Sequence, residues 1–326
     1  MKRISLFASF LTISVFFSHT LLGQWERVDE NLIHITQQKL FTHVSLLANT
    51  ITQGRATGSQ GALIAANYIM KQFQNYGLHP YSGNSYYQSF RTEGLVGRNV
   101  VAMVKGRVYP DEYLIISAHY DHLGEINGTV YPGADNNASG VSLLLQIAEI
   151  FGLRAKAGDA PPRSVIFVAY DAKEHNLAGS EYFARTLTIY PYQVIANLNI
   201  DQIGTVLEPP NRKSEYLLVL GAEHPSRDMK LIIDVANHYG KIGLDIDYTF
   251  YGSKTFFDLF FQIGDQIHLS KRRIPSILFT SGIHAYTNKP TDLPALLNLA
   301  VLEKRTQLIY LVANDLATRR SWLRNY

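Results

Sequence analysis

Three apolar segments of this chain each end in side chains that can bind metal or transfer protons, and this pattern constrains the fold most. Arg163–Tyr170 reads RSVIFVAY and is followed by Glu174, EYLIISAHYDH contains His119, and VIANLNID ends at Asp201. Short β-branched and aromatic runs of this kind are typical of strands that are covered on both faces of a parallel sheet. Ligands of open α/β sheets bind where such strands end. The sequence therefore predicts a metal or acid–base site at one sheet edge.

The composition favours a globular protein and excludes several classes of function. The chain has 326 residues, of which 46% are hydrophobic and 17% charged, and its formal net charge is +3. No charge run or aromatic–basic interleaving points to a nucleic-acid partner. The sequence contains no cysteine, which excludes disulfides, thiol catalysis and thiolate zinc sites.

The first 23 residues are typical of a secretory signal peptide. Lys2 and Arg3 precede the apolar run Ile4–Phe17, and small and polar residues lead to a cleavage site near Gly23–Gln24. The alternative is an uncleaved membrane anchor, although the apolar run is short for a bilayer span. We expect an exported protein, periplasmic or extracellular, with no stable membrane span after cleavage and one domain over residues 24–326.

Strand-like and helix-like segments alternate along the mature chain. Amphipathic or apolar stretches predict helices at Ser59–Tyr76, Ser139–Phe151 and Leu293–Thr318, and Ile274–Thr280 resembles a late strand. Such alternation predicts a single α/β domain with αβα layers, in which a central mixed, mostly parallel sheet carries helices on both faces.

Six segments occur in the order found in the M28 family of zinc peptidases, and the mature chain resembles that family over about residues 32–318. These segments are GRATGSQG, SAHYDHLG, GADNNASG, DAKEHNLAGS, NIDQIG and HAYTNKPTD. The resemblance implies a zinc-exopeptidase-like fold and a site in which two zinc ions, roughly 3.5–4 Å apart, hold a hydrolytic water.

By the same resemblance, some residues match the family's site and others depart from it. His119, Glu174 and Asp201 match metal ligands, and Asp121 matches the aspartate that orients the histidine. Asn136 stands at the bridging aspartate, Lys173 at the general-base glutamate and Asn288 at the last histidine ligand.

These three replacements weaken the expected chemistry. An amide is a poor bridge between two dications, and an asparagine is a poorer zinc ligand than an imidazole. A lysine is normally a cation at neutral pH and is not expected to act as the base. We hypothesise that the Lys173 ammonium, between Glu174 and Asp201, takes the electrostatic role of a missing zinc ion.

Two interpretations of function remain open. The first is a secreted peptidase homologue that is inactive or weakened and binds a peptide or protein in its retained cleft. The second is an active zinc-dependent aminopeptidase-type hydrolase with a reduced or rearranged metal site, in which Asp135 or His284 substitutes for a lost ligand. In the first interpretation the site holds no metal, and in the second its cofactor is zinc. Asp135 is otherwise expected to be a solvated loop residue, and Tyr286 is a candidate for lining the substrate pocket.

Overall fold

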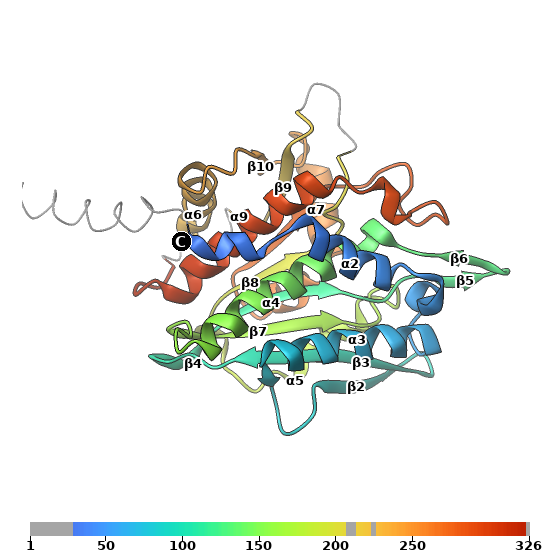
Figure 1. The fold of residues 1–326 in the computed structure, drawn as a ribbon, viewed down its shortest axis with the longest axis horizontal. Coiled ribbons are helices and arrows are strands. Elements are labelled where there is room, and N and C mark those ends of the chain that lie inside the picture. Colours follow the sequence, from blue (N-terminus) through green and yellow to red (C-terminus); the bar gives the residue numbers. More distant parts are fainter. Residues whose placement is uncertain (1–28, 207–212, 223–225, 324–326) are drawn as a thin grey trace, which may run out of the picture.

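The computed structural model describes residues 29–206, 213–222 and 226–323 (Figure 1). The predicted signal peptide, residues 1–23, lies outside these ranges, so its processing stays a prediction.

Nine strands of the described chain form one mixed sheet, in the order β1-β3-β7-β4-β8-β11-β9-β10 with β2 paired to β3. β4 runs parallel to both β7 and β8, and β11 is parallel to β8, whereas the pairs at β3 and between β11 and β9 are antiparallel. The strands are β1 (His79–Pro80), β2 (Tyr87–Thr92), β3 (Leu95–Val104), β4 (Tyr109–His119), β7 (Arg163–Tyr170), β8 (Val194–Ile200), β9 (Tyr216–Leu220), β10 (Asp245–Asp247) and β11 (Ser276–Thr280). β5 (Gly124–Ile126) and β6 (Thr129–Tyr131) form a separate hairpin that projects beside the sheet in Figure 1.

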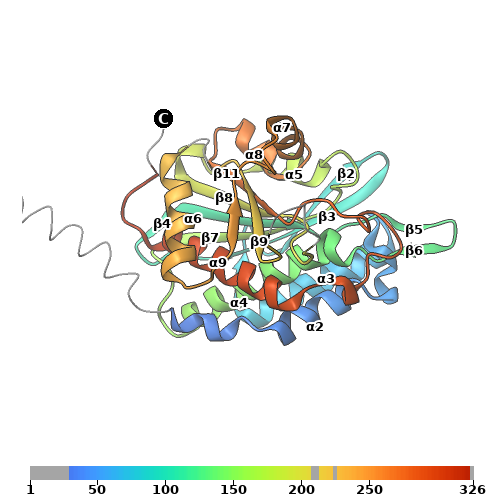
Figure 2. The ribbon, with the colours of Figure 1, turned by 90° about the horizontal axis from the view of Figure 1, so that it is seen from above.

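Helices cover both faces of the sheet, as predicted (Figure 2). One face carries α2 (Gln37–Leu47), α3 (Gln60–Tyr76), α4 (Gly140–Lys156) and α9 (Leu299–Thr318), with α6 (Arg227–Tyr239) packed against α9; the other carries α5 (Ala178–Thr186), α7 (Lys254–Gln262) and α8 (Gln266–Lys271). Every residue of β7 and β8 is buried, which confirms that these apolar runs are strands covered on both faces.

Helix α3 begins and ends where the sequence predicts. The Ser59 hydroxyl accepts a hydrogen bond from the Ala62 backbone N–H at 3.1 Å and caps the first turn. At the other end Gly77 has a φ of 83°, a left-handed conformation that glycine adopts without strain.

Other boundaries differ from the sequence predictions. The last helix begins at Leu299 rather than Leu293, because Pro294–Leu296 forms a separate 3-10 turn. Among the described residues, Ala134–Lys156 is long and apolar enough to cross a membrane, but 78% of its most apolar window is buried inside the protein. This segment is therefore best explained as the core helix α4 with its preceding turn.

Candidate active site

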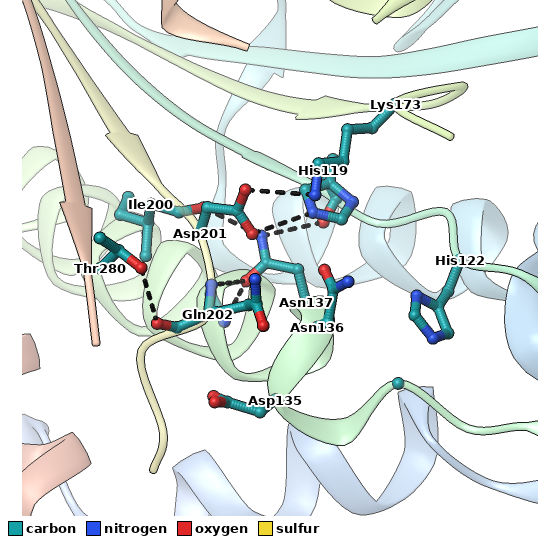
Figure 3. Close-up of polar contacts among 12 residues, drawn as sticks. His119, His122, Asp135, Asn136, Asn137, Lys173, Ile200, Asp201, Gln202 and Thr280 are labelled. Carbon is teal, nitrogen blue, oxygen red and sulfur yellow. Dashed lines mark hydrogen bonds and ion pairs between the residues drawn. The ribbon is translucent and has the colours of Figure 1, made fainter. Parts of the chain in front are cut away.

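The predicted site residues come together at the carboxyl ends of three neighbouring strands (Figure 3). β4 ends at His119, and β7 and β8 flank it on either side. Lys173 and Glu174 follow β7, and Asp201 follows β8. The sheet order thus brings the charged residues from three separate segments to one place, as the sequence pattern predicted.

His119, Asp201 and Lys173 form a continuous ionic chain. Nε2 of His119 lies 3.2 Å from Oδ1 of Asp201, and Nζ of Lys173 lies 3.3 Å from Oδ2 of the same carboxylate. The other ring nitrogen of His119, Nδ1, is 3.1 Å from the carbonyl oxygen of Asp121 and 3.6 Å from its Oδ1. Asp201 therefore contacts a cationic or hydrogen-donating group on each oxygen.

The pKa values of these groups reflect their mutual pairing. Burial alone would lower the pKa of Lys173, but the carboxylates of Asp201 and Glu174 outweigh it and raise that pKa above its ordinary value. Burial and Lys173 also oppose protonation of His119, yet Asp201 and Asp121 raise its pKa to about 9. Burial would raise the pKa of Asp201, whereas Lys173 and His119 hold it well below the usual range. The ionic chain is thus charged at neutral pH.

The contacts of Glu174 differ from those of Asp201. Its backbone N–H donates to Oδ2 of Asp121 at 3.1 Å, and burial raises the pKa of its carboxyl group. Within the described part of the chain, Lys173 forms its ion pair with Asp201 and none with Glu174. The ammonium therefore pairs directly with Asp201, while Glu174 acts on it as a nearby negative charge.

The two asparagines of the predicted site are bonded to each other. Nδ2 of Asn136 donates to Oδ1 of Asn288 at 2.7 Å. Asp292 fixes the backbone around Asn136. Its carboxylate accepts hydrogen bonds from the backbone N–H groups of Asp135 at 2.9 Å and of Asn136 at 3.0 Å. Both positions thus lie at the site, and one hydrogen bond joins their amides, while Oδ1 of Asn136 has no partner among the described residues.

Asp135 and His284 pair with each other, which contradicts the expectation that Asp135 is a solvated loop residue. Asp135 is fully buried, and its carboxylate accepts hydrogen bonds from the Gly204 N–H at 2.6 Å and the Thr205 hydroxyl at 2.8 Å. Nε2 of His284 lies 3.0 Å from Oδ2 of Asp135, and Nδ1 of His284 accepts from the Tyr286 N–H at 3.2 Å. Because each side chain is already committed to this pair, neither is positioned as a substitute metal ligand.

A cavity of about 470 Å³ opens beside the ionic chain. Its polar lining includes Asn136, Lys173, Glu174, Asp201 and Asn288, and its apolar lining includes Leu177, Phe260, Ile263, Leu278 and Ile283. Tyr286 is not among the residues that line this cavity, and its role in substrate binding stays a prediction. Its ring lies 6.1 Å from the His284 ring and is 37% exposed.

Comparisons with known proteins fit this geometry. The sequence model of peptidase family M28 matches residues 99–313, about two thirds of the chain. This chain belongs to peptidase family M28. The match includes every strand end that contributes to the site.

Individual M28 relatives are distant. A "Probable zinc metalloprotease" of Pyricularia oryzae is 35% identical over 112 residues, which is 33% of this chain and 21% of that protein. Human "Transferrin receptor protein 2" is 26% identical over 144 residues, 44% of this chain and 17% of that protein. The matched segments thus span less than a quarter of these relatives' lengths. The LapA aminopeptidase structure from Legionella pneumophila covers 90% of this chain and is itself covered to 74%, with a TM-score of 0.71 at 19% identity, which shows a shared fold.

Three buried residues that support this M28 site were not singled out from the sequence. The Asn137 side chain donates to the Ile200 carbonyl at 2.9 Å and accepts from the Gln202 N–H at 3.0 Å, which fixes the end of β8. Arg55 is fully buried and donates to backbone carbonyls, including those of Tyr120 and Gly133. Each of the three residues lies inside one of the motifs quoted from the sequence, and that position is the signal from which the sequence could have identified it.

His122 is the third of these residues. Neither ring nitrogen has a hydrogen-bond partner among the residues described, and Nδ1 lies 3.9 Å from Oε1 of Glu174. Burial, followed by the charge of Arg55, holds the pKa of His122 well below its ordinary value. The ring is therefore neutral beside the Glu174 carboxylate.

Proposed function

We propose that this chain is a secreted M28 homologue that binds peptide or protein segments in its cleft and hydrolyses them weakly or not at all. The observation that carries the proposal is the ion pair between Lys173 and Asp201. The Lys173 ammonium is a cation of the chain itself, and it lies at a carboxylate that the family resemblance assigns to zinc. Lys173 also stands where that resemblance places the general base.

The residues present do not fit a pair of zinc ions. A dication near Asp201 would be repelled by the Lys173 ammonium 3.3 Å from that carboxylate. A bridging ligand must supply negative charge to two dications, whereas the Asn136 side chain is neutral and directs its N–H₂ group to Asn288. Asp135 and His284, the two groups that could have restored ligands, hold each other. These residues therefore do not support hydrolysis through a pair of zinc ions.

A role in binding is supported by what the site retains. The cavity of about 470 Å³ combines polar groups with an apolar wall, as ligand sites commonly do. One relative that matches 44% of this chain is named as a receptor rather than as a peptidase. The export of the protein is proposed from the signal-peptide pattern of its first 23 residues.

The alternative, an active aminopeptidase-type hydrolase with one zinc ion, is favoured by the retention of His119, Glu174 and Asp201. In the structure, however, Nε2 of His119 lies 3.2 Å from Oδ1 of Asp201, and the other oxygen of that carboxylate pairs with the Lys173 ammonium. Restoring the family residues with Asn136→Asp, Lys173→Glu and Asn288→His separates the two interpretations.

The assay is hydrolysis of aminoacyl p-nitroanilides with added zinc, by the parent and by the triple variant. We expect activity only in the triple variant. Equal activity in the parent would contradict the proposal and support the one-zinc alternative. If neither protein is active, single-turnover assays with longer peptides decide whether the parent hydrolyses anything.

A further inference from the structure

A second cavity lies at the edge of the sheet that β1 and β2 form. Both strands pair with the side of β3 that faces away from β7, and the chain between them, residues 81–86, leaves the sheet and returns to it (Figure 1). We call residues 81–86 the edge loop. Val101 of β3 lies at its base, where the Val101 N–H donates to the Tyr86 carbonyl at 2.7 Å.

The edge loop, the start of β2 and the end of α5 line a cavity of about 260 Å³ at this edge. It shares no lining residue with the cavity beside the ionic chain. The ionic chain lies at the ends of β4, β7 and β8, whereas the second cavity lies on the outer side of β3. The two cavities are therefore separate sites.

The lining of this second cavity is aromatic and polar but uncharged. Among the described residues it consists of four tyrosines, two serines, two threonines, one glutamine and one valine. Every side chain except the valine therefore has a hydroxyl or an amide group, and none is charged at neutral pH. Such a lining favours a neutral ligand, because a charged group would lose its water without gaining a charged partner.

The sequence of the edge loop has the composition of a recognition loop. It reads YSGNSY. Antibody loops are enriched in the same residues, because tyrosine supplies rigid ring surface while serine and asparagine supply adaptable hydrogen bonds. The composition thus agrees with the lining in indicating a binding surface for an uncharged polar molecule.

Hydrogen bonds between the walls fix the shape of this cavity. The Gln88 amide donates to the Thr186 hydroxyl at 3.0 Å and accepts from the Asn99 amide at 2.9 Å. The hydroxyl groups of Tyr81 and Thr188 lie 3.3 Å apart. These contacts join β2 and the edge loop to the end of α5. A ligand therefore meets side chains that are already ordered, which lowers the entropy cost of binding.

Two hydroxyl groups of the lining remain available to a ligand. Those of Ser82 and Tyr182 have no hydrogen-bond partner among the residues that the structure describes. The Tyr182 ring is nevertheless fixed, because it stacks on Phe90 with 5.3 Å between the ring centroids and 24° between the ring planes. Each free hydroxyl can donate one hydrogen bond and accept two.

From these contacts we infer that the second cavity binds a neutral saccharide. A sugar has apolar C–H groups, which pack against tyrosine rings, and hydroxyl groups, which bond to Ser82 and Tyr182. The cavity of about 260 Å³ is slightly smaller than the roughly 300–1,000 Å³ typical of drug-sized ligands, so it holds a short saccharide or the end of a longer chain. This site does not depend on whether the cleft binds peptides.

The test is a titration of the whole purified protein with defined sugars, followed by saturation-transfer NMR. The neutral probes are glucose, galactose, mannose, N-acetylglucosamine, maltose and cellobiose, and the charged counterparts are glucosamine and glucuronic acid. We expect at least one neutral probe to bind with a Kd of about 1 mM or lower, and about tenfold or more tightly than both charged sugars.

Two results of this titration would overturn the inference. One is the absence of binding by every neutral probe up to about 10 mM. The other is equal affinity for the neutral and the charged sugars. A soluble polymer of the sugar that binds then identifies the source of the ligand. Tighter binding of the polymer supports a site for the end of a polysaccharide or glycan, and equal binding per chain end supports a site for free sugar.

Variants of the protein test the residue assignment. Tyr182→Phe and Ser82→Ala each remove one free hydroxyl and little else, and we expect each to weaken binding of the neutral sugar about threefold to tenfold. Tyr192→Phe is the matched control, because Tyr192 is 74% exposed and lines a different cavity. Circular dichroism and Tm confirm that the variants fold. Unchanged affinity in the double variant Ser82→Ala, Tyr182→Phe would overturn the assignment to this cavity.

Discussion

Replacing Lys173 by Met should destabilise the metal-free protein, and the structure allows the size of the effect to be worked out. Nζ of Lys173 lies 3.3 Å from Oδ2 of Asp201, and the two side chains are only 15% and 11% exposed. Two unit charges at this distance attract by about 5 kcal/mol if the effective dielectric constant is about 20. Removing one partner of a buried pair typically costs about 3–5 kcal/mol, because the other charge is left buried. The slight exposure of both groups reduces this, so we expect a loss of about 2–4 kcal/mol.

The assay is urea unfolding followed by circular dichroism in the presence of chelator. Lys304→Met is the matched control, because Lys304 forms a shorter 2.7 Å pair with Glu215 but the two side chains are 35% and 44% exposed. Exposed pairs contribute about 0–1 kcal/mol, so this control should change little. The double variant Lys173→Met, Asp201→Asn should recover part of the lost stability. If Lys173→Met costs no more than Lys304→Met, the idea that Lys173 acts as an internal counter-ion is refuted.

Three further predictions test the surroundings of the site. Burial, aided by Lys39, lowers the pKa of His43 to about 4 from an ordinary value of 6.5, so the contribution of His43 to stability is full above pH 6.5 and is lost as the pH falls to 4. In urea unfolding, His43→Gln should therefore remove up to about 3 kcal/mol of the pH dependence of the unfolding free energy. An identical pH profile in the variant would contradict this. Arg55→Met should lower the free energy of unfolding by about 3 kcal/mol or more, since several buried carbonyls lose a charged donor, and a change below about 1 kcal/mol in the same assay would contradict it. His284→Ala should cost about 2–4 kcal/mol by leaving the Asp135 carboxylate short of one donor, and a double-mutant cycle with Asp135→Asn that shows no coupling would refute this pairing.

The parts of the fold that could be predicted from the sequence are those with a strong local pattern. β7 and β8 are continuous apolar runs, and α3 has a serine cap and a terminal glycine, so each could be recognised from its own residues. β2 could not, because Tyr87–Thr92 alternates between exposed and partly buried positions with only Phe90 fully buried. Its strand conformation depends on pairing with β3 and not on its own composition.

Part of the candidate site could likewise be predicted from the sequence, and part could not. The approach of Lys173 to Asp201 follows from the parallel order β7-β4-β8, which the strand-end pattern indicated. The pairing of Asp135 with His284 joins residues 149 positions apart, and no local pattern predicts it. The sequence suggests that Asp135 is solvated because it lies in a loop rich in glycine and asparagine. In the structure, four donors surround its carboxylate inside the protein, from Ser139, Gly204, Thr205 and His284. The orientation of a buried polar side chain is set by such distant partners.

We propose that a lysine of the chain replaces metal at this M28 site. The most direct measurement is the zinc content of the mature protein after purification with zinc and exhaustive dialysis, beside the variant Asn136→Asp, Lys173→Glu, Asn288→His. We expect nearly no zinc in the parent and up to about two ions per chain in the variant, as for a two-metal site. One or two tightly held zinc ions in the parent would contradict it.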